Sequence, residues 1–219
     1  MDLIYCAGGG KRFAEIAINA GFLYGSRLPS TVYFSPYFVD QDWKKAAKNY
    51  ARYYARYFEA LEKHKPHIAT VLDFEHHWQR PVVLQWAEEA AKHAEIVVII
   101  PKVQGTVHEI PRIIGGKPVR LGYSVPSTYG GTALPYSDFI GWPIHLLGGS
   151  PQKQLRLRKF MDVKSADCNT HMLMANYNKV FVGGKWVRLD SLCQHVDQDS
   201  NYRSFELSCK NIKSAWNSK

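Results

Sequence analysis

Carboxylates follow two strand-like segments of this chain at the point where each segment ends. Asp167 lies among small residues near the end of the strand-like part of VKSADCNT (163–170), and Asp73 with Glu75 closes the buried-type segment HIATVLDFE (67–75). A carboxylate can act as a nucleophile, as a general acid or base, or as an acceptor for the N–H groups of a bound ring. A single Asp after a strand can also form a turn or cap a helix, so its neighbours decide between these roles.

Length and composition limit the class of protein to which this sequence can belong. The 219 residues, 46% hydrophobic and 21% charged, fit a globular chain with a sizeable core. No stretch reaches the roughly 18 apolar residues of a membrane span, and the first ten residues lack the pattern of a secretory signal. We therefore expect a cytoplasmic protein without a membrane partner. Irregular cysteine spacing predicts reduced thiols rather than a disulfide framework at Cys6, Cys168, Cys193 and Cys209.

The excess of positive charge favours a polyanionic partner. Lys and Arg number 28 against 19 Asp and Glu, a formal net charge of +9, which suits nucleic acid but also plain solubility. The run GGSPQKQLRLRK (148–159) carries four of these cations, predicted to contact phosphates or to form an ordinary solvated helix face. They are Lys153, Arg156, Arg158 and Lys159.

Short apolar segments with strand character recur along the chain, several of them separated by helical patterns. Uninterrupted runs such as VVII fit strands that are covered on both faces. Eight such segments predict an α/β fold, a compact (β/α)8 TIM-like barrel over residues 1–175 that lacks a helix or two. The segments are 3–7, 22–28, 31–37, 67–75, 95–103, 118–127, 143–150 and 162–169.

Helices are expected at 11–20, from about 43 to 64, and from 81 to about 94. The Tyr stripe of the second suggests core packing, with base stacking as the alternative. Residues 176–219 form a second region, a C-terminal β-hairpin around Gly183-Gly184 and a polar, poorly periodic tail, packed on the barrel.

Polar residues at the carboxyl ends of barrel strands converge on one mouth. Two carboxylates, an amide and a glycine pair would then share a cleft that can hold a flat polar ring beside a reactive group. The residues expected there are Gly8 to Gly10, Arg27, Ser35, Asp73, Glu75, Lys102, Gln104, Ser124, Gly148, Gly149 and Asp167.

Four of these strand ends resemble segments of the tRNA-guanine transglycosylase superfamily. VLDFE is similar to its strand-end Asp-Glu segment, KVQGTVHE to Val-Gln-Gly-Ser/Thr, LLGGS to Leu-Gly-Gly, and SADCN to Phe-Asp-Cys or Phe-Asp-Ser. The resemblance spans about residues 1 to 175 and is nearest to the short phage branch that inserts 7-deazaguanines into DNA. It implies two catalytic carboxylates, the nucleophile Asp167 and Asp73, which accepts hydrogen bonds from the departing guanine. It also implies that Glu75, Gln104 and the backbone of Gly148 and Gly149 bind the base.

Two departures from that family qualify the resemblance. Its Cys-x-Cys-x-x-Cys zinc site is missing, and Cys193, His195 and Cys209 imitate it only in part. Its Asp-Ser-Gly segment is replaced by YFSPYFVDQDW, where Asp40 or Asp42 can stand in as the general base. The first departure favours DNA over tRNA, since the tRNA enzymes use the zinc subdomain for substrate binding.

The resemblance therefore implies a pentosyltransferase that exchanges guanine in DNA, or alternatively in tRNA, for a 7-deazaguanine through a covalent Asp–sugar intermediate. We expect no cofactor and no metal, and for a phage enzyme the host cytoplasm; any partner protein is unknown. Two other functions remain open. One is a glycoside or nucleoside hydrolase with the same carboxylates, and the other is a non-catalytic nucleic-acid-binding accessory of a modification system.

Overall fold

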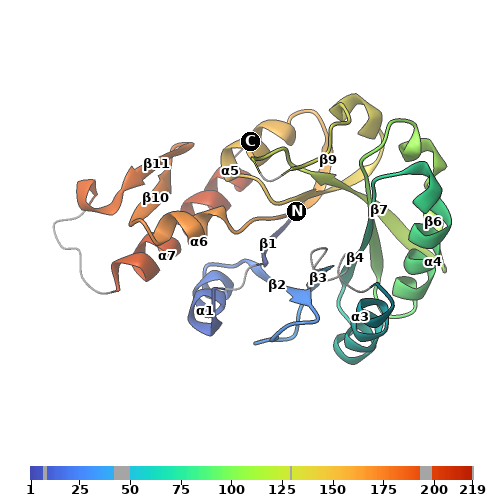
Figure 1. Ribbon diagram of the computed structural model, residues 1–219. Coiled ribbons are helices and arrows are strands. Elements are labelled where there is room, and N and C mark those ends of the chain that lie inside the picture. Colours follow the sequence, from blue (N-terminus) through green and yellow to red (C-terminus); the bar gives the residue numbers. More distant parts are fainter. Residues whose placement is uncertain (7–8, 42–49, 129, 193–198, 219) are drawn as a thin grey trace.

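Eight parallel strands close into a barrel in the computed structural model, which describes residues 1–6, 9–41, 50–128, 130–192 and 199–218 (Figure 1). Each strand pairs with the next along the chain, β5 pairs with β7, and β9 returns to β1. The predicted TIM-like barrel is confirmed. Its strands are β1 (Asp2–Cys6), β2 (Leu23–Leu28), β3 (Phe38–Gln41), β4 (Ile68–Phe74), β5 (Ile96–Pro101), β7 (Lys117–Ser124), β8 (Pro143–Leu147) and β9 (Asp162–Asp167).

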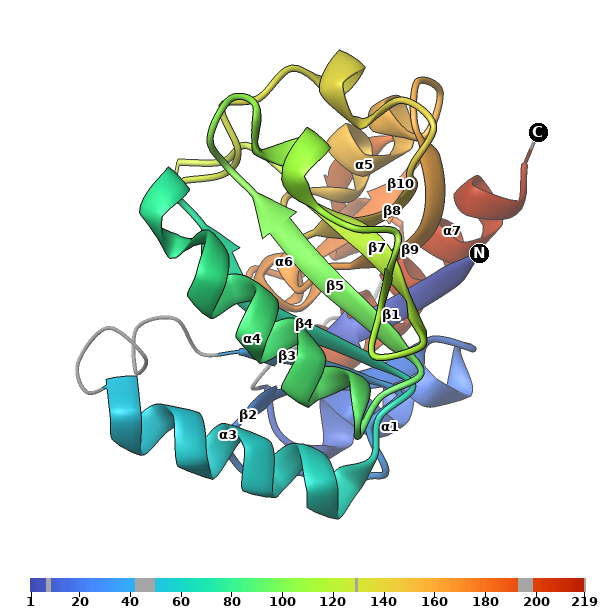
Figure 2. The same ribbon diagram turned by 90° about the vertical axis from the view of Figure 1, so that its right-hand side faces the viewer.

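Helices cover the outside of the barrel, and α3 and α4 lie next to each other over the strands β3 to β5 (Figure 2). Short 3-10 turns replace full helices after β5 and after β7, and β6 (Ile113–Ile114) pairs antiparallel with the start of β7. None of the helices in the described ranges is both long and apolar enough to cross a bilayer. The helices are α1 (Lys11–Asn19), α3 (Tyr50–His64), α4 (Arg80–Ala91), α5 (Pro151–Leu157), α6 (Thr170–Ala175) and α7 (Ser200–Asn217); the 3-10 turns are η1 (His77–Gln79), η2 (Thr106–Glu109), η3 (Tyr136–Phe139) and η4 (Leu189–Ser191).

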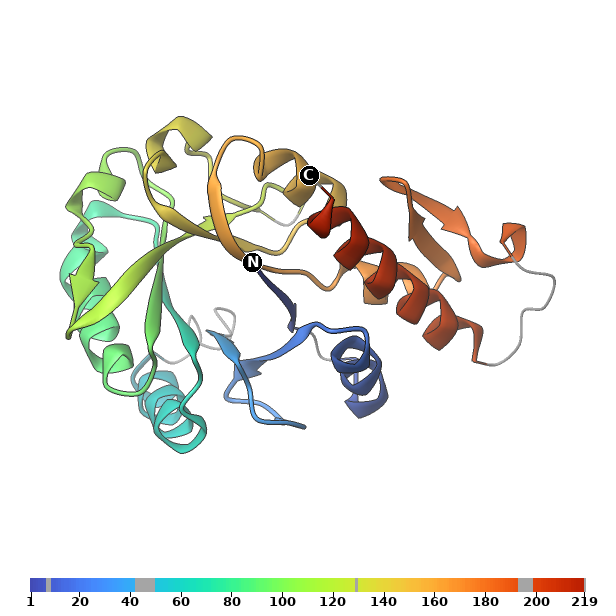
Figure 3. The same ribbon diagram turned by 180° about the vertical axis from the view of Figure 1, so that it is seen from behind.

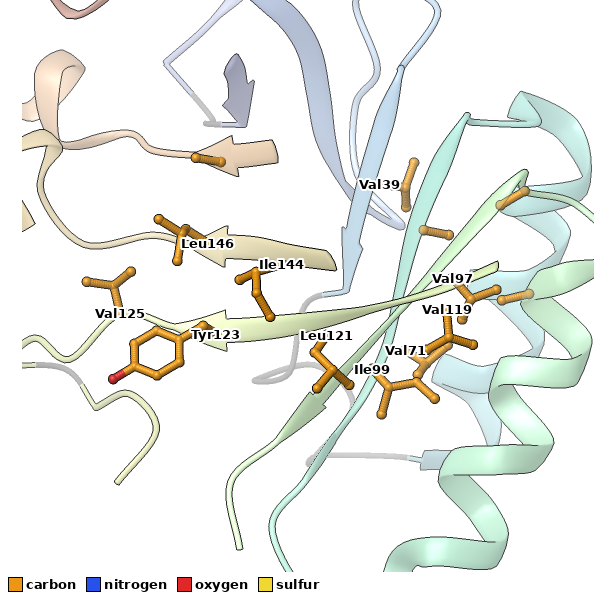
Figure 4. Packing of buried hydrophobic residues seen from close by; sticks show 14 of the residues in the cluster. Val39, Val71, Val97, Ile99, Val119, Leu121, Tyr123, Val125, Ile144 and Leu146 are labelled. Carbon is orange, nitrogen blue, oxygen red and sulfur yellow. The ribbon is translucent and has the colours of Figure 1, made fainter. Parts of the chain in front are cut away.

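The apolar strands carry two sets of buried side chains, one on each face. Val97 and Ile99 of β5 belong to the large cluster between the strands and the helices, which Figure 4 shows from close by. Val98 and Ile100 belong to a smaller cluster inside the barrel, with residues of β1, β3 and β4. Burial on both faces explains why this segment is apolar without alternation.

The strand predicted at 31–37 is wrong, because the third strand is β3, which begins at Phe38. Pro36 has no N–H group to donate to a neighbouring strand. The segment before it is held partly through a side chain, since the amide of Tyr33 donates to the hydroxyl of Tyr24 (3.2 Å). The shift moves Asp40 to the end of a barrel strand.

The C-terminal region contains a helix where the sequence pattern predicted a tail. Strands β10 (Lys179–Val182) and β11 (Lys185–Arg188) pair antiparallel, and α7 packs against β10, α6 and α1 beside the barrel (Figure 3). The tail prediction failed because the buried face of α7 mixes serines with apolar residues, which hides the helical period. That face is Ser200, Ser204, Phe205, Ser208, Cys209, Ile212 and Trp216.

His171 of α6 gives the fold a specific weakness toward acid. Its ring is fully buried among Tyr5, Phe22 and Phe205, and neither nitrogen has a hydrogen-bond partner in the described part of the chain. Burial lowers the pKa of His171 to about 3. The unfolded chain, with an ordinary histidine pKa near 6.5, binds this proton more readily, so stability falls as the pH drops from about 6.5 toward 3.

We expect His171→Leu to flatten that dependence. Below about pH 6 the wild-type protein should lose roughly 1.4 kcal/mol of unfolding free energy per pH unit through this group, and the variant should not. Urea unfolding at pH 7 and pH 5 measures the difference. The matched variant His108→Leu, at an exposed position, should keep the wild-type dependence. Equal slopes in all three proteins would contradict the assignment.

Candidate functional site

A cavity of about 950 Å³ opens at the carboxyl ends of the barrel strands. It brings together eight of the residues expected at the mouth: Arg27, Asp73, Glu75, Lys102, Ser124, Gly148, Gly149 and Asp167. Its wall also includes Cys6, Asp40, Gln41, Leu72, Trp78, Gln79, Val82, Ile100, Val125, Ser127, Gly130, Gly131, Leu147 and Asn169.

Two register shifts aim the carboxylates at this cavity. Thr70 pairs with Val98, but Asp73 pairs with Ile100, so β4 contains one residue more than β5 over this span. The extra residue places both Leu72 and Asp73 on the cavity wall. Strand β9 contains a similar irregularity against β8, two residues before Ser165. Bulges of this kind re-aim side chains beside functional sites.

Asp167 lies at the end of β9 with its side chain 13% exposed. Its Oδ1 accepts the N–H of Gly148 (3.2 Å) and lies 3.3 Å from Nε2 of His145. No hydrogen bond to Oδ2 is found among the described residues. One carboxylate oxygen is therefore held in place while the other remains available to a molecule in the cavity.

A polar chain continues beneath Asp167 into the barrel. His145 Nδ1 lies 2.6 Å from Ser165 Oγ, which accepts a hydrogen bond from Arg120 (2.6 Å). His145 and Ser165 are fully buried, and Phe38 stacks on the imidazole at 4.6 Å. Burial lowers the pKa of His145 and keeps the ring neutral, against the opposing effect of Asp167.

Asp40 is the protonatable carboxylate of the cavity. Its Oδ1 accepts from the hydroxyl of Thr70 (3.0 Å) and from the amide of Gln41 (2.9 Å). Burial raises the pKa of Asp40 to about 7, with a further increase from the Asp167 carboxylate and opposition from the Thr70 hydrogen bond. Both protonation states are thus populated near neutral pH, which suits an acid and base.

Asp73 forms an ion pair with Lys102, whose Nζ also lies 3.1 Å from Glu75. The Lys102 contact is to Oδ2 of Asp73. Burial raises the pKa of Asp73, although Lys102 opposes the increase. A cation at this position neutralises part of the negative charge on the wall and orients the carboxylate, so that Oδ1 can accept from a ligand.

The glycine pair gives the cavity a wall of bare backbone. Gly148 and Gly149 have φ angles of 61° and 74°, and a Cβ on Gly149 would clash with Val125. Buried Gln154 of α5 fixes this turn, since its Nε2 donates to the carbonyl oxygens of Gly148 (2.8 Å) and Asp167 (2.7 Å). The two strand ends that hold Asp167 and the glycines are therefore tied together.

The basic run divides into groups with different surroundings. Arg158 donates to the carbonyl oxygens of Trp216 (2.7 Å) and Ser218 (2.6 Å), so it anchors the end of α7. Lys153 donates to the carbonyl oxygen of Pro126 (2.6 Å). Arg156 and Lys159 are exposed. None of these cations lines the cavity.

Other residues predicted for the site do not line the cavity or are not among the described residues. Gln104 and Ser35 are exposed and do not line it. Asp42, Cys193 and His195 lie outside the described residues. Within those residues, no three His, Cys, Asp or Glu side chains cluster as metal ligands would.

Sequence reasoning missed His145, Ser165 and Trp78. The first two are single polar residues on buried strands, and the only signal was their alternation with Ile144, Leu146 and Ala166, which face the outer core. Trp78 is 73% exposed at the cavity and stacks on His76 (5.7 Å). An exposed Trp after a strand end carries no spacing signature.

Fold and site together define a (β/α)8 barrel with a carboxylate-lined cavity at the carboxyl ends of its strands. Residues 17–217 match the profile of DUF6610, a family of unknown function, and the chain belongs to that family. No curated protein matches the chain.

Proposed function

We propose that this protein is a base-exchanging transglycosylase, which replaces guanine in a nucleic acid by a 7-deazaguanine. One observation carries the proposal: Asp167 has one oxygen held by Gly148 and His145, and it shares a cavity with Asp40, whose pKa is raised to about 7. A fixed carboxylate beside a protonatable one is what displacement at a sugar carbon requires.

The first half-reaction removes guanine. An oxygen of Asp167 attacks the anomeric carbon, the C1′–N9 bond breaks, and its electron pair leaves with the base. Protonated Asp40 supplies the proton that neutralises the departing guanine anion. The sugar then remains joined to Asp167 through a C1′–O bond.

The second half-reaction reverses these roles. Ionised Asp40 takes the ring N–H proton of the incoming 7-deazaguanine, and the ring nitrogen attacks C1′. The C1′–O bond breaks and Asp167 recovers its negative charge. Asp40 ends protonated, ready for the next cycle, so no further reactant is consumed.

Base recognition is assigned to Asp73, to the glycine pair and to Trp78. Asp73 can accept hydrogen bonds from the ring N–H and the exocyclic amine of guanine. The bare backbone at Gly148 and Gly149 lets the ring approach closely. Exposed Trp78 offers a stacking surface at the same cavity, where an aromatic ring typically contributes 1–3 kcal/mol per stacked base.

The polymer is assigned as DNA rather than tRNA. The net charge of +9 favours phosphate contacts, and the sequence lacks the zinc-site pattern of the tRNA-guanine transglycosylases. The target nucleotide must leave the stack to reach Asp167, at a cost of a few kcal/mol.

Label transfer tests the proposal. We expect a radiolabelled 7-deazaguanine to enter duplex DNA when protein is present, with release of one guanine for each base incorporated. Filter binding after acid precipitation measures the label, and nucleoside mass spectrometry measures the product. tRNA is run in parallel.

The possible outcomes separate the candidate functions. Guanine release without incorporation indicates a hydrolase, because water then resolves the intermediate. Salt-sensitive DNA binding with neither release nor incorporation indicates a non-catalytic accessory. Incorporation into tRNA alone would overturn the assignment to DNA.

A further inference from the structure

The polar chain under Asp167 contains groups that the proposed reaction does not yet use. Arg120 is 9% exposed on β7, and His145 and Ser165 are fully buried. They connect in one line, from the guanidinium through the Ser165 hydroxyl and the imidazole to Asp167 Oδ1, with separations of 2.6, 2.6 and 3.3 Å.

The direction of each hydrogen bond in the polar chain follows from which groups can donate and which can accept. A guanidinium can only donate, so Ser165 Oγ accepts from Arg120. Ser165 Oγ has a second lone pair and could also accept from Nδ1–H, but Nε2 would then turn its own lone pair toward the Asp167 carboxylate. The neutral imidazole avoids this repulsion by carrying its proton on Nε2, and its Nδ1 accepts the hydroxyl hydrogen of Ser165.

We propose that Arg120, Ser165 and His145 position the Asp167 nucleophile by presenting an Nε2–H donor to its Oδ1. This assignment rests on the proposed function for the identity of the reaction, but the hydrogen-bond pattern itself does not depend on it. None of the three residues lines the cavity, so they are positioning residues and not catalytic ones.

The polar chain of Arg120, Ser165 and His145 has a physical purpose that apolar packing would not serve. Rotation about the Cα–Cβ and Cβ–Cγ bonds of Asp167 would otherwise exchange its two oxygens and move the attacking atom. Two donors on the same oxygen, Gly148 N–H and His145 Nε2–H, fix the carboxylate plane. Phe38 stacked at 4.6 Å in turn fixes the imidazole plane.

An apolar cluster lies beside these groups in the barrel interior, which makes the polar chain costly to keep without a role. The neighbouring interior cluster consists of Ile4, Cys6, Phe38, Ile68, Val98 and Ile100. Buried polar side chains destabilise a core unless each is satisfied. Here every member has a partner, and the chain ends at the nucleophile.

A pair of His145 variants tests the role of the donor. His145→Gln keeps an N–H group near the position of Nε2, whereas His145→Leu removes it at similar volume. We expect the Leu variant to form the covalent DNA adduct about 10- to 100-fold more slowly, the scale seen when groups that orient a reacting ligand are removed. The Gln variant should recover most of that rate. DNA affinity should be unchanged in both, because the defect lies in the chemical step.

A spectroscopic measurement tests the tautomer without any activity. Long-range ¹H–¹⁵N correlation spectra of histidine-labelled protein should show His145 neutral, with its proton on Nε2, and the His145→Gln spectrum assigns the signal. In Ser165→Ala the Nδ1 resonance should move toward that of an imidazole nitrogen without a hydrogen bond, and adduct formation should slow.

The results that would overturn the proposal are distinct. The proposal is refuted if wild type and His145→Leu form the adduct at equal rates. It is also refuted if the folded Leu and Gln variants lose the same amount of rate, or if the imidazole carries its proton on Nδ1. If His145→Leu does not fold, Ser165→Ala decides, and an unchanged rate with a shifted Nδ1 signal would refute the positioning role. A wild-type protein that shows the predicted tautomer but forms no adduct would instead refute the proposed function.

Discussion

Replacement of Asp167 by Asn is expected to abolish both base exchange and the covalent protein–DNA adduct. The amide keeps an oxygen that can accept from Gly148 and His145, so the surroundings of the residue should survive. It removes the negatively charged oxygen that bonds C1′ in the proposed mechanism, and a neutral amide is a poor nucleophile. The loss should be roughly 10⁴-fold or more, as for other enzymes that lose their nucleophile.

A denaturing gel provides the measurement. Wild-type protein incubated with DNA alone, without 7-deazaguanine and without added guanine that would reverse the first step, should give a slow-migrating band, and Asp167→Asn should give none. Asp167→Ala, which cannot deamidate back to Asp, should behave in the same way.

Asp162→Asn serves as the matched control. Asp162 lies at the opposite end of β9, is 56% exposed, and pairs with Lys164 at 2.8 Å. Its variant should keep the adduct. Exchange retained by both Asp167 variants would show that this carboxylate only forms the turn after β9.

Asp40→Asn is expected to slow guanine release by roughly 10² to 10⁴, the usual contribution of a general acid. In the wild type, the rate of adduct formation should fall as the pH rises through about 7, because the protonated form of Asp40 donates the proton and its pKa is raised to about 7. The variant has no proton to lose at this position, so that limb of the profile should disappear.

Stopped reactions over pH 5.5 to 8.5 give the profile. The Asn side chain still offers an oxygen to Thr70 and to the Gln41 amide, so the melting temperature should change little. Glu109→Gln, at a salt bridge with Arg80 (3.2 Å) away from the cavity lining, is the control and should keep the limb. A limb that persists in Asp40→Asn would assign the titration to another group.

The carboxylates of β4 and β9 could be placed from the sequence because both strands are recognisable from their residue pattern. Asp73 follows the apolar run IATVL, Asp167 ends the strand-like segment VKSA, and side chains at the carboxyl ends of parallel strands must meet at one mouth. The sequence alone therefore predicted that Asp73 and Asp167 share one site. The bulge that turns Asp73 into the cavity had no counterpart in the pattern.

Asp40 was harder to place because β3 has only four residues and follows a proline. The preceding aromatic segment resembles a strand more than β3 does, and it displaced the prediction toward Ser35. His145 was missed for a different reason. A single histidine within an apolar strand looks like an ordinary core residue until the neighbouring strands supply Ser165 and Asp167 beside it.

The pairing of β1 with β9 also bears on how the protein is made. Ile4 lies opposite Asp167, so the first strand of the barrel can complete its pairing only after the last barrel strand has been synthesised. Until then β1 offers an unpaired edge to other chains, and contacts so distant in sequence form slowly. Asp40 and Asp73 are synthesised early, but they do not share a cavity with Asp167 before that closure. The candidate site therefore stays incomplete in a nascent chain until the last barrel strand has paired with the first.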